Sequence, residues 1–147
     1  MADSPLNEAA SGLTTFTVLI DGNAIDDSYS VIYISVDKAV NKVPSAKVVL
    51  LDGDASIQDF EVSNSADFVP GNEIEIKAGY ESTEETIFKG TIVRHGLRVN
   101  KYSASELVIE CRDKAVKMTI GRNNASFVDK KDSDAITTLI GNHVGLS

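Results

Sequence analysis

The residue types that most often carry chemistry, cysteine and histidine, occur three times in this chain, as Cys111, His95 and His143. Cys111 continues the alternation of LVIEC on the face of Leu107 and Ile109, which favours a small core residue because a free cysteine packs as a hydrophobe. His95 lies at an expected strand bend, and His143 lies near an expected helix end. No ligand-like spacing joins the two histidines to an acidic residue. These residues therefore predict no metal site.

Three groups of acidic residues are the remaining candidates for a binding site. Residues 52–54 (DGD) begin like a calcium loop but lack the later acidic positions and the distal glutamate, which favours a turn. Glu81, Glu84 and Glu85 are interpreted as a solvated hairpin tip, with an interaction surface as the alternative. Residues 129–134 (DKKDSD) are interpreted as a polar connection followed by a helix cap.

The sequence motifs of the common catalytic sites are missing from the chain. It contains no G-x-S-x-G, no H-E-x-x-H and no Walker loop. Because the acids, the histidines and the cysteine show no usable spacing, we predict no catalytic residue, no cofactor-binding residue and no bound metal. The protein is therefore expected not to be an enzyme.

Composition limits the classes of partner. The 147 residues include 14 basic and 22 acidic side chains, a formal charge of −8, and 42% of them are hydrophobic. The hydrophobic fraction is typical of a globular domain. The acidic balance disfavours binding to nucleic acid and stable anchoring on an anionic membrane surface. A single cysteine excludes an intramolecular disulfide.

The start of the chain carries no recognisable export signal. Residues 1–12 are expected to form a flexible arm, and they have neither the basic nor the apolar region of a secretory signal. No apolar run approaches the roughly 20 residues of a membrane-spanning helix. We therefore expect synthesis in the cytoplasm and, for any export, a route without a signal peptide.

The segment that organises the expected fold is residues 68–94. After a Pro-Gly turn signal, charged and apolar residues alternate over EIEIKA, with the period of a half-buried antiparallel strand. A polar, acidic loop follows, and residues 86–94 return as a strand that residues 96–99 prolong past a bend. Gly90 inside the returning strand predicts a bulge or a sharp bend.

Further strands are expected at residues 13–20, 28–36, 46–51 and 106–112. The Asp-Gly pair after the first of these favours a tight hairpin. The segment 28–36 is apolar on both faces, so we predict that it is either central in the sheet or covered by another subunit.

Two other segments allow two interpretations each, and a third allows one. Residues 56–68 are expected to form one helical turn or an irregular loop. Residues 115–120 are expected to extend the preceding strand or to start a new one. Residues 127–128 are expected to form a short edge strand at most.

The end of the chain has the period of a helix from Asp132. Its apolar residues are Ile136, Leu139, Ile140 and Val144. Asp132 or Ser133 is expected to cap the first turn, and Gly145 is expected to end the helix. Because a domain seldom stops at the cap of an amphipathic helix, we expect this chain to be the N-terminal part of a longer protein.

The predicted fold class is mainly β: an antiparallel β-barrel of about six or seven strands, followed by one amphipathic helix. The predicted organisation is an arm at residues 1–12, a first barrel at 13–131, and a helix at 132–147 that opens the following segment. The residues predicted to point into the barrel are Ile74, Ile76, Ile92, Leu107 and Ile109.

The order of these features resembles the hub part of contractile-injection spikes. The residues that carry the likeness are 40–56 (VNKVPSAKVVLLDGDAS), 68–80 (FVPGNEIEIKAGY), 87–97 (IFKGTIVRHGL), 107–119 (LVIECRDKAVKMT) and 132–146 (DSDAITTLIGNHVGL). The family comprises the VgrG tip proteins of type VI secretion and the late-control D-type baseplate hubs of contractile phages. The chain looks closest to the VgrG-like branch of type VI and extracellular contractile systems.

This resemblance implies a structural component that joins an inner tube to a puncturing spike and helps to deliver effectors. In the family, a trimer with two barrels per chain forms a pseudo-hexameric ring. The implied partners are two further copies of the complete protein, an Hcp-like inner-tube hexamer, and spike-tip and effector proteins. The implied location is the injection apparatus, which is ejected from the cell. This chain departs from the family pattern because it lacks the second barrel, the neck and the needle.

The alternative function is a generic β-barrel module that binds a small ligand or a peptide. The interior of the barrel separates the two hypotheses. An interior packed with Ile, Val and Phe favours the hub, whereas a polar, open cavity favours the ligand binder.

Overall fold

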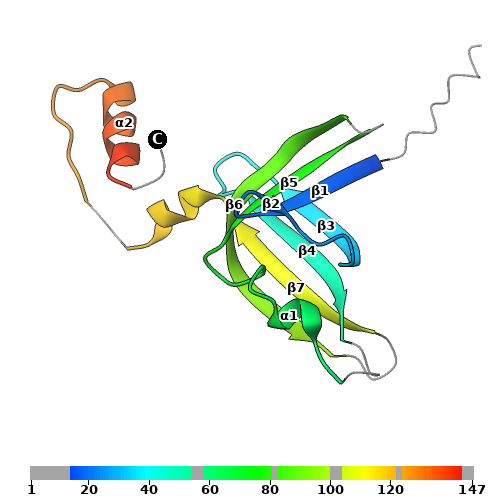
Figure 1. Ribbon diagram of the computed structural model, residues 1–147. Coiled ribbons are helices and arrows are strands. Elements are labelled where there is room, and N and C mark those ends of the chain that lie inside the picture. The colour runs from blue at the N-terminus through cyan, green and yellow to red at the C-terminus, as the bar shows by residue number, and fades with distance from the viewer. Residues whose placement is uncertain (1–13, 54–57, 81–82, 100–103, 122–123, 144–147) are drawn as a thin grey trace, which may run out of the picture.

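The computed structural model describes residues 14–53, 58–80, 83–99, 104–121 and 124–143, and it consists mainly of one antiparallel sheet (Figure 1). Seven strands follow one another across the sheet in the order β2-β1-β5-β6-β7-β4-β3. Their bounds are β1 Thr14–Ile20, β2 Asn23–Ala24, β3 Val31–Asp37, β4 Ser45–Asp52, β5 Glu73–Tyr80, β6 Thr83–Arg98 and β7 Ser105–Arg112. The helical segments are α1 Glu61–Asn64, the 3-10 helix η1 Lys114–Thr119 and α2 Asp132–Gly141. The predicted mainly β class and strand number are confirmed.

The hairpin of β5 and β6 is the centre of the sheet, as predicted. β6 is 16 residues long, and it pairs with β5 over its first part and with β7 over its second part. It continues without a break through His95 and Gly96, which confirms that the strand extends past this point. β6 therefore connects the part of the sheet that contains β1 and β5 to the part that contains β7 and β4.

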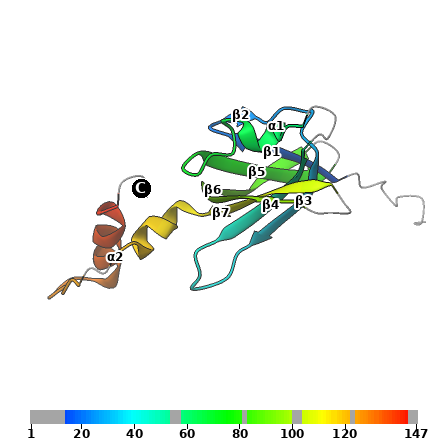
Figure 2. The same cartoon turned by 90° about the horizontal axis from the view of Figure 1, so that it is seen from below.

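Three β-bulges bend the sheet. The pairing register shifts at three places. Ile87 and Val93 are the extra residues in β6, and Ile32 is the extra residue in β3. A bulge bends its strand and increases its twist, and Figure 2 shows the β3–β4 end of the sheet turned beneath the β1–β5 end. Gly90, which was predicted to mark a bulge or bend, instead pairs regularly opposite Ile74 and lies between two of the bulges.

The predicted barrel is observed as a curled, open sheet. β1 with the short β2 forms one end of the sheet, β3 forms the other end, and no ladder joins them among the described residues. The prediction that the segment 28–36 is central is therefore wrong, because β3 pairs only with β4. The alternative, that another subunit covers it, stays a prediction.

β3 is reached from β1 through a short return. Asp21 and Gly22 both have positive φ, 49° and 84°, and Ile20 pairs with Asn23 across them. This is the two-residue hairpin that the Asp-Gly pair predicted. The returning strand β2 is only two residues long, so the chain leaves β1 early and pairs next with β4.

The core lies inside the curl of the sheet and is apolar. The five residues predicted to point inward are each at most 1% exposed. Val18 from β1, Val48 and Leu50 from β4, and Phe88 from β6 are buried with them. Phe68, in the connection between α1 and β5, is also fully buried. The interior is therefore filled by Ile, Val, Leu and Phe side chains.

The ambiguous segments adopt helical or irregular structure. One helical turn, α1, forms within residues 56–68. Residues 115–120 were predicted to be a strand, but they belong largely to η1, whose first turn is capped by the Asp113 carboxylate accepting a hydrogen bond from the Ala115 N–H at 2.8 Å. Residues 127–128 form no strand in the described segment 124–143.

The helix α2 begins at Asp132 as predicted, but neither Asp132 nor Ser133 caps it. Its N-cap residue is Lys131, which makes no side-chain cap hydrogen bond. The helix ends at Gly141 with Asn142 as its C-cap, so the predicted end at Gly145 is wrong. The predicted arm at 1–12 lies outside the described residues. No described residue of α2 is buried, and Figure 1 shows the helix standing apart from the sheet beyond η1. Among the described helices, none is long and apolar enough to cross a membrane.

Candidate functional site

Cys111 is a core residue, as the sequence predicted. It lies on β7 between Ala46 of β4 and Ile92 of β6 and is 1% exposed. Burial, with a smaller contribution from the charge of Glu110, raises the pKa of its thiol to about 12. A protonated and buried thiol is a poor nucleophile, so the residue contributes packing.

The two histidines lie on separate elements. His95 is on β6, where its Nδ1 lies 3.1 Å from the carbonyl oxygen of Phe68. His143 follows α2, and its backbone N–H donates to the Ile140 carbonyl. Within the described segments, no group of three or more His, Cys, Asp or Glu side chains is placed to hold a metal ion. The absence of a bound metal stays a prediction.

Asp52, the first residue of the calcium-like DGD motif, has a structural role. Its buried carboxylate accepts hydrogen bonds from the backbone N–H groups of Gly53, Val62 and Ser63, at 2.8, 3.1 and 2.9 Å. The carboxylate thus fastens the turn at the end of β4 to the start of α1. Asp54 lies outside the described residues.

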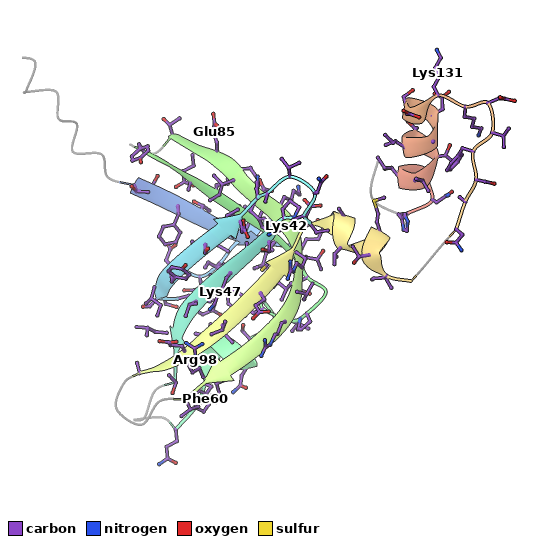
Figure 3. All side chains as sticks on the ribbon, turned by 180° about the vertical axis from the view of Figure 1, so that it is seen from behind. Lys42, Lys47, Phe60, Glu85, Arg98 and Lys131 are labelled. Atoms are coloured by element: carbon purple, nitrogen blue, oxygen red, sulfur yellow. The ribbon has the colours of Figure 1, made fainter. Side chains whose placement is uncertain are left out.

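The acidic loop is shorter than predicted, because β6 begins at Thr83 and its first residues belong to the ladder with β5. Figure 3 shows Glu85 near the free end of the β5–β6 hairpin and Phe60 at the opposite end of the molecule. Glu84 and Glu85 pair with Gly79 and Ala78 of β5, whereas Glu81 lies outside the described residues. An interaction role for these acids stays a prediction.

Charged side chains on the outer face of the sheet are mostly paired with neighbours. Arg94 contacts Glu110 at 3.3 Å, and Arg98 contacts Glu106 at 3.0 Å. These are solvent-exposed pairs, which contribute little to stability. They add charged groups to the outer face of β6 and β7, which also exposes Val93.

The most distinctive surface is the opening between the two ends of the sheet. β1, β3, β5 and β6 line a cavity of about 260 Å³ there. Three large apolar side chains at this opening are substantially exposed: Phe16 at 47%, Ile32 at 49% and Tyr33 at 53%. We call this cavity the apolar groove. Its lining residues are Thr14, Phe16, Val31, Ile32, Tyr33, Ile34, Ile76, Ala78 and Ile87.

A second cavity of about 220 Å³ adjoins the apolar groove, because Phe16 and Val31 line both. Asp26 and Asp27, from the connection between β2 and β3, also line this second cavity. The side chain and backbone of Ser28 hydrogen-bond to the Asp26 carboxylate and hold its pKa below the usual value. The cavity therefore carries negative charge at neutral pH, and we call it the acidic end.

A third cavity of about 470 Å³ lies where the β3–β4 turn meets η1. Asp37, Lys42 and Arg112 bring charges of both signs to it, and Val116 contributes an apolar wall. Figure 3 shows Lys42 beside the start of η1. We interpret this cavity as a solvent-exposed junction between the β3–β4 turn and η1.

The sequence did not predict the apolar groove. The apolar residues on both faces of the segment 28–36 predicted a strand that is central or covered by another subunit, whereas β3 lies at an edge, where Ile32 and Tyr33 are exposed. Phe16 was missed, because LTTFTVLI reads as an ordinary half-buried strand. Its exposure follows from the open edge of the sheet, which no local pattern reports.

Residues 10–147 match the model of a protein family described as the Alg8 N-terminal domain. The chain belongs to the Alg8 N-terminal domain family. This family assignment covers every strand described above. No curated protein shows significant sequence similarity to the chain.

The fold of this Alg8 N-terminal domain family member is similar to that of a solved phage protein. The crystal structure is that of the 43 kDa tail protein of prophage MuSo2 from Shewanella oneidensis. The two chains are 10% identical, and they superpose with a TM-score of 0.52 over 76% of this chain and 31% of the tail protein. The chain thus spans about a third of that protein's length. At this identity the likeness shows a phage-tail-like fold alone, and the finer VgrG assignment stays a prediction.

Proposed function

We propose that this chain is the N-terminal hub part of a VgrG-like spike protein in a contractile injection apparatus. In this role it joins the inner tube to the puncturing spike and helps to deliver effectors. The observation that carries the proposal is the curled seven-stranded sheet, which is similar to a phage tail protein over 76% of the chain. The ordered sequence motifs of the hub family support the same assignment.

The packed interior also supports the hub. The space inside the curl is filled by apolar side chains such as Phe88 and Leu50, both at most 1% exposed. A structural ring component needs a stable core rather than an internal cavity for a ligand. The exposed edge strand β3 supports the proposal further, because a neighbouring barrel in a ring would cover its apolar residues.

The proposed partners follow from the hub role. The complete protein is proposed to be a homotrimer that contacts an Hcp-like hexamer of the inner tube on one side and spike-tip and effector proteins on the other. It is proposed to be made in the cytoplasm without a signal peptide, assembled into the apparatus and ejected from the cell. We propose no catalytic activity, cofactor or nucleic-acid partner.

The test is the mass of the full-length protein by light scattering across a range of concentrations. A trimer that also co-elutes with the tube hexamer of the same system is the expected result. Tyr33→Lys, which places a charge on the exposed edge strand, should weaken the trimer. Val93→Lys also places a lysine on an exposed residue, here in β6, and should leave the trimer intact.

The alternative remains a binding module for a small ligand or a peptide, and the apolar groove is the observation that favours it. A full-length protein that stays monomeric at every concentration and does not bind the tube hexamer would exclude the hub and leave this alternative.

A further inference from the structure

The two ends of the sheet leave backbone groups unpaired on the same side of the molecule. β1 pairs with β2 only at Leu19 and Ile20, and the Val18 carbonyl accepts a hydrogen bond from the Ile25 N–H. Within the described residues, the outer edge of Thr14 to Thr17 therefore carries no ladder. The outer edge of β3 is likewise free, because β3 pairs only with β4. Free strand edges of this kind are templates for another strand.

Both free edges border the apolar groove. Thr14 and Phe16 of β1 line it on one side, and residues 31–34 of β3 line it on the other. Ile76 and Ala78 of β5 are also in its lining. An extended segment lying here would meet backbone partners at its edge and apolar side chains on its inner face, which is how peptides bind by strand addition.

The bulge in β3 increases the apolar surface at the groove. Ile32 is the extra residue, so Val31 pairs with Leu50 and Tyr33 pairs with Val49. A bulge breaks the alternation of side chains between the two faces of a strand. Residues 31–34 of β3, which include the bulge, all line the groove, and Ile32 and Tyr33 are its exposed members.

The charges around the groove select the kind of segment that fits. Among the described residues, the groove is lined by apolar side chains and by the side chains of Thr14 and Tyr33, and none of its lining residues is charged. Its continuation, past Phe16 and Val31, ends at the carboxylates of Asp26 and Asp27. A complementary segment has apolar residues along its length and a Lys or Arg at the end that reaches these carboxylates.

We propose that the apolar groove binds an extended segment of another protein by strand addition to the free edge of β3. Apolar side chains of this segment pack against Phe16 and Ile34, and a basic side chain pairs with Asp26 and Asp27. The bound segment thus adds a strand next to β3, on the side where the sheet is open. The proposal goes beyond the hub function and does not depend on it, because it concerns the monomeric chain, in which no neighbouring copy covers β3.

The test starts from a random peptide library displayed on phage and selected against the purified chain. The expected result is an enriched consensus of alternating apolar residues with Lys or Arg at one end. A synthetic peptide of the consensus, labelled with a fluorophore, should bind in an anisotropy titration. Hydrogen exchange should show slower exchange of the β3 amides when this peptide is bound.

Matched variants test whether the peptide binds at the apolar groove or at another surface. Phe16→Ser and Tyr33→Lys should each weaken binding of the peptide at least tenfold, whereas Val93→Ser and Val93→Lys on the outer face should not. Asp26→Asn keeps the oxygen that accepts the Ser28 N–H and should weaken binding several-fold in low salt. Asp132→Asn, in the first turn of α2, is the control for that change. Circular dichroism establishes that each variant is folded.

A backbone-methylated form of the peptide tests the strand pairing itself. It keeps the side chains but lacks the N–H donors, so its affinity should fall at least tenfold. Equal binding by the methylated peptide would overturn strand addition. A selection that enriches no sequence, a consensus without a basic residue, or binding that survives both Phe16→Ser and Tyr33→Lys would overturn the proposal. These outcomes are read on the monomeric chain, so they are distinct from the mass of the full-length protein that tests the hub function.

Discussion

The carboxylate of Asp52 accepts a hydrogen bond from the backbone N–H of Val62 at 3.1 Å, across ten residues of chain. The same carboxylate also receives the N–H groups of Gly53 and Ser63. Asp52 lies in a motif that looks like the start of a calcium loop, but its carboxylate accepts hydrogen bonds from the backbone of its own chain. It links β4 to α1, and the adjacent Val62 closes one end of the core.

We predict that Asp52→Ala destabilises the protein by roughly 1–3 kcal/mol, because buried backbone donors lose their acceptor. Asp52→Asn, which retains one carbonyl oxygen, should cost less than Asp52→Ala. Urea unfolding followed by circular dichroism measures both. Added calcium should leave the midpoint of the parent unchanged, and a stabilising effect of calcium would contradict the structural role of this carboxylate.

A second prediction concerns the core of the central hairpin. Ile76 of β5 is fully buried, so Ile76→Ala should cost roughly 2–5 kcal/mol through lost burial and a residual cavity. Ile32→Ala removes the same atoms at an exposed position and should change stability by no more than about 0.5 kcal/mol. Thermal unfolding of the two variants provides the comparison. A melting temperature of Ile76→Ala within about a degree of the parent would show that the strand assignment is wrong.

A third prediction uses two glycines of the same strand. A Cβ on Gly90 would lie 2.2 Å from the backbone oxygen of Arg112, whereas a Cβ on Gly96 would have its nearest neighbour at 3.9 Å. Gly90→Ala must therefore push β6 and β7 apart, at an expected cost of about 1–3 kcal/mol. Gly96→Ala should be neutral or slightly stabilising, because alanine restricts the unfolded chain. Equal effects of the two substitutions in urea unfolding would contradict the close approach at Gly90.

The fourth prediction concerns the thiol of Cys111. Its pKa is raised from 9.0 to about 12 in the folded state by burial. The folded protein then keeps the proton that the unfolded chain loses above pH 9, so the thiol's contribution to stability is present below pH 9 and is lost as the pH rises towards 12. The loss of stability between these pH values should be smaller in Cys111→Ala than in the parent.

The same burial predicts how the thiol reacts. A disulfide reagent such as dithionitrobenzoate should leave Cys111 unmodified in the native protein at pH 8 and modify it fully in denaturant. Rapid modification of the native protein at that pH would show that the β4–β7 part of the sheet opens readily.

The sequence by itself determined the local elements. The alternation of EIEIKA and of LVIECR has the period of a strand with one buried face, so the inward direction of Ile74, Ile76, Leu107 and Ile109 could be read directly. The positive φ values that Asp-Gly allows likewise set the hairpin after Ile20. Such features depend on a residue and its close neighbours in the chain, and a single sequence contains them.

Some local features were still misjudged. Residues 115–120 have strand-like composition, yet the Asp113 side chain caps a 3-10 turn there, and this competes with continuation of β7. Lys131 occupies the N-cap of α2, where Asp132 or Ser133 was expected. In both cases the choice between neighbouring residues rests on small differences in energy that a pattern does not resolve.

Only the tertiary structure decided where each strand lies in the sheet. The segment 28–36 looked suited to a central strand, but pairing with β4 alone places β3 at an edge. The apolar groove depends on this, since Phe16 of β1 and Tyr33 of β3 line one cavity although β5, β6, β7 and β4 lie between their strands in the sheet. Strand order and curvature are set by pairings between residues distant in sequence, and these pairings leave no period in the chain itself.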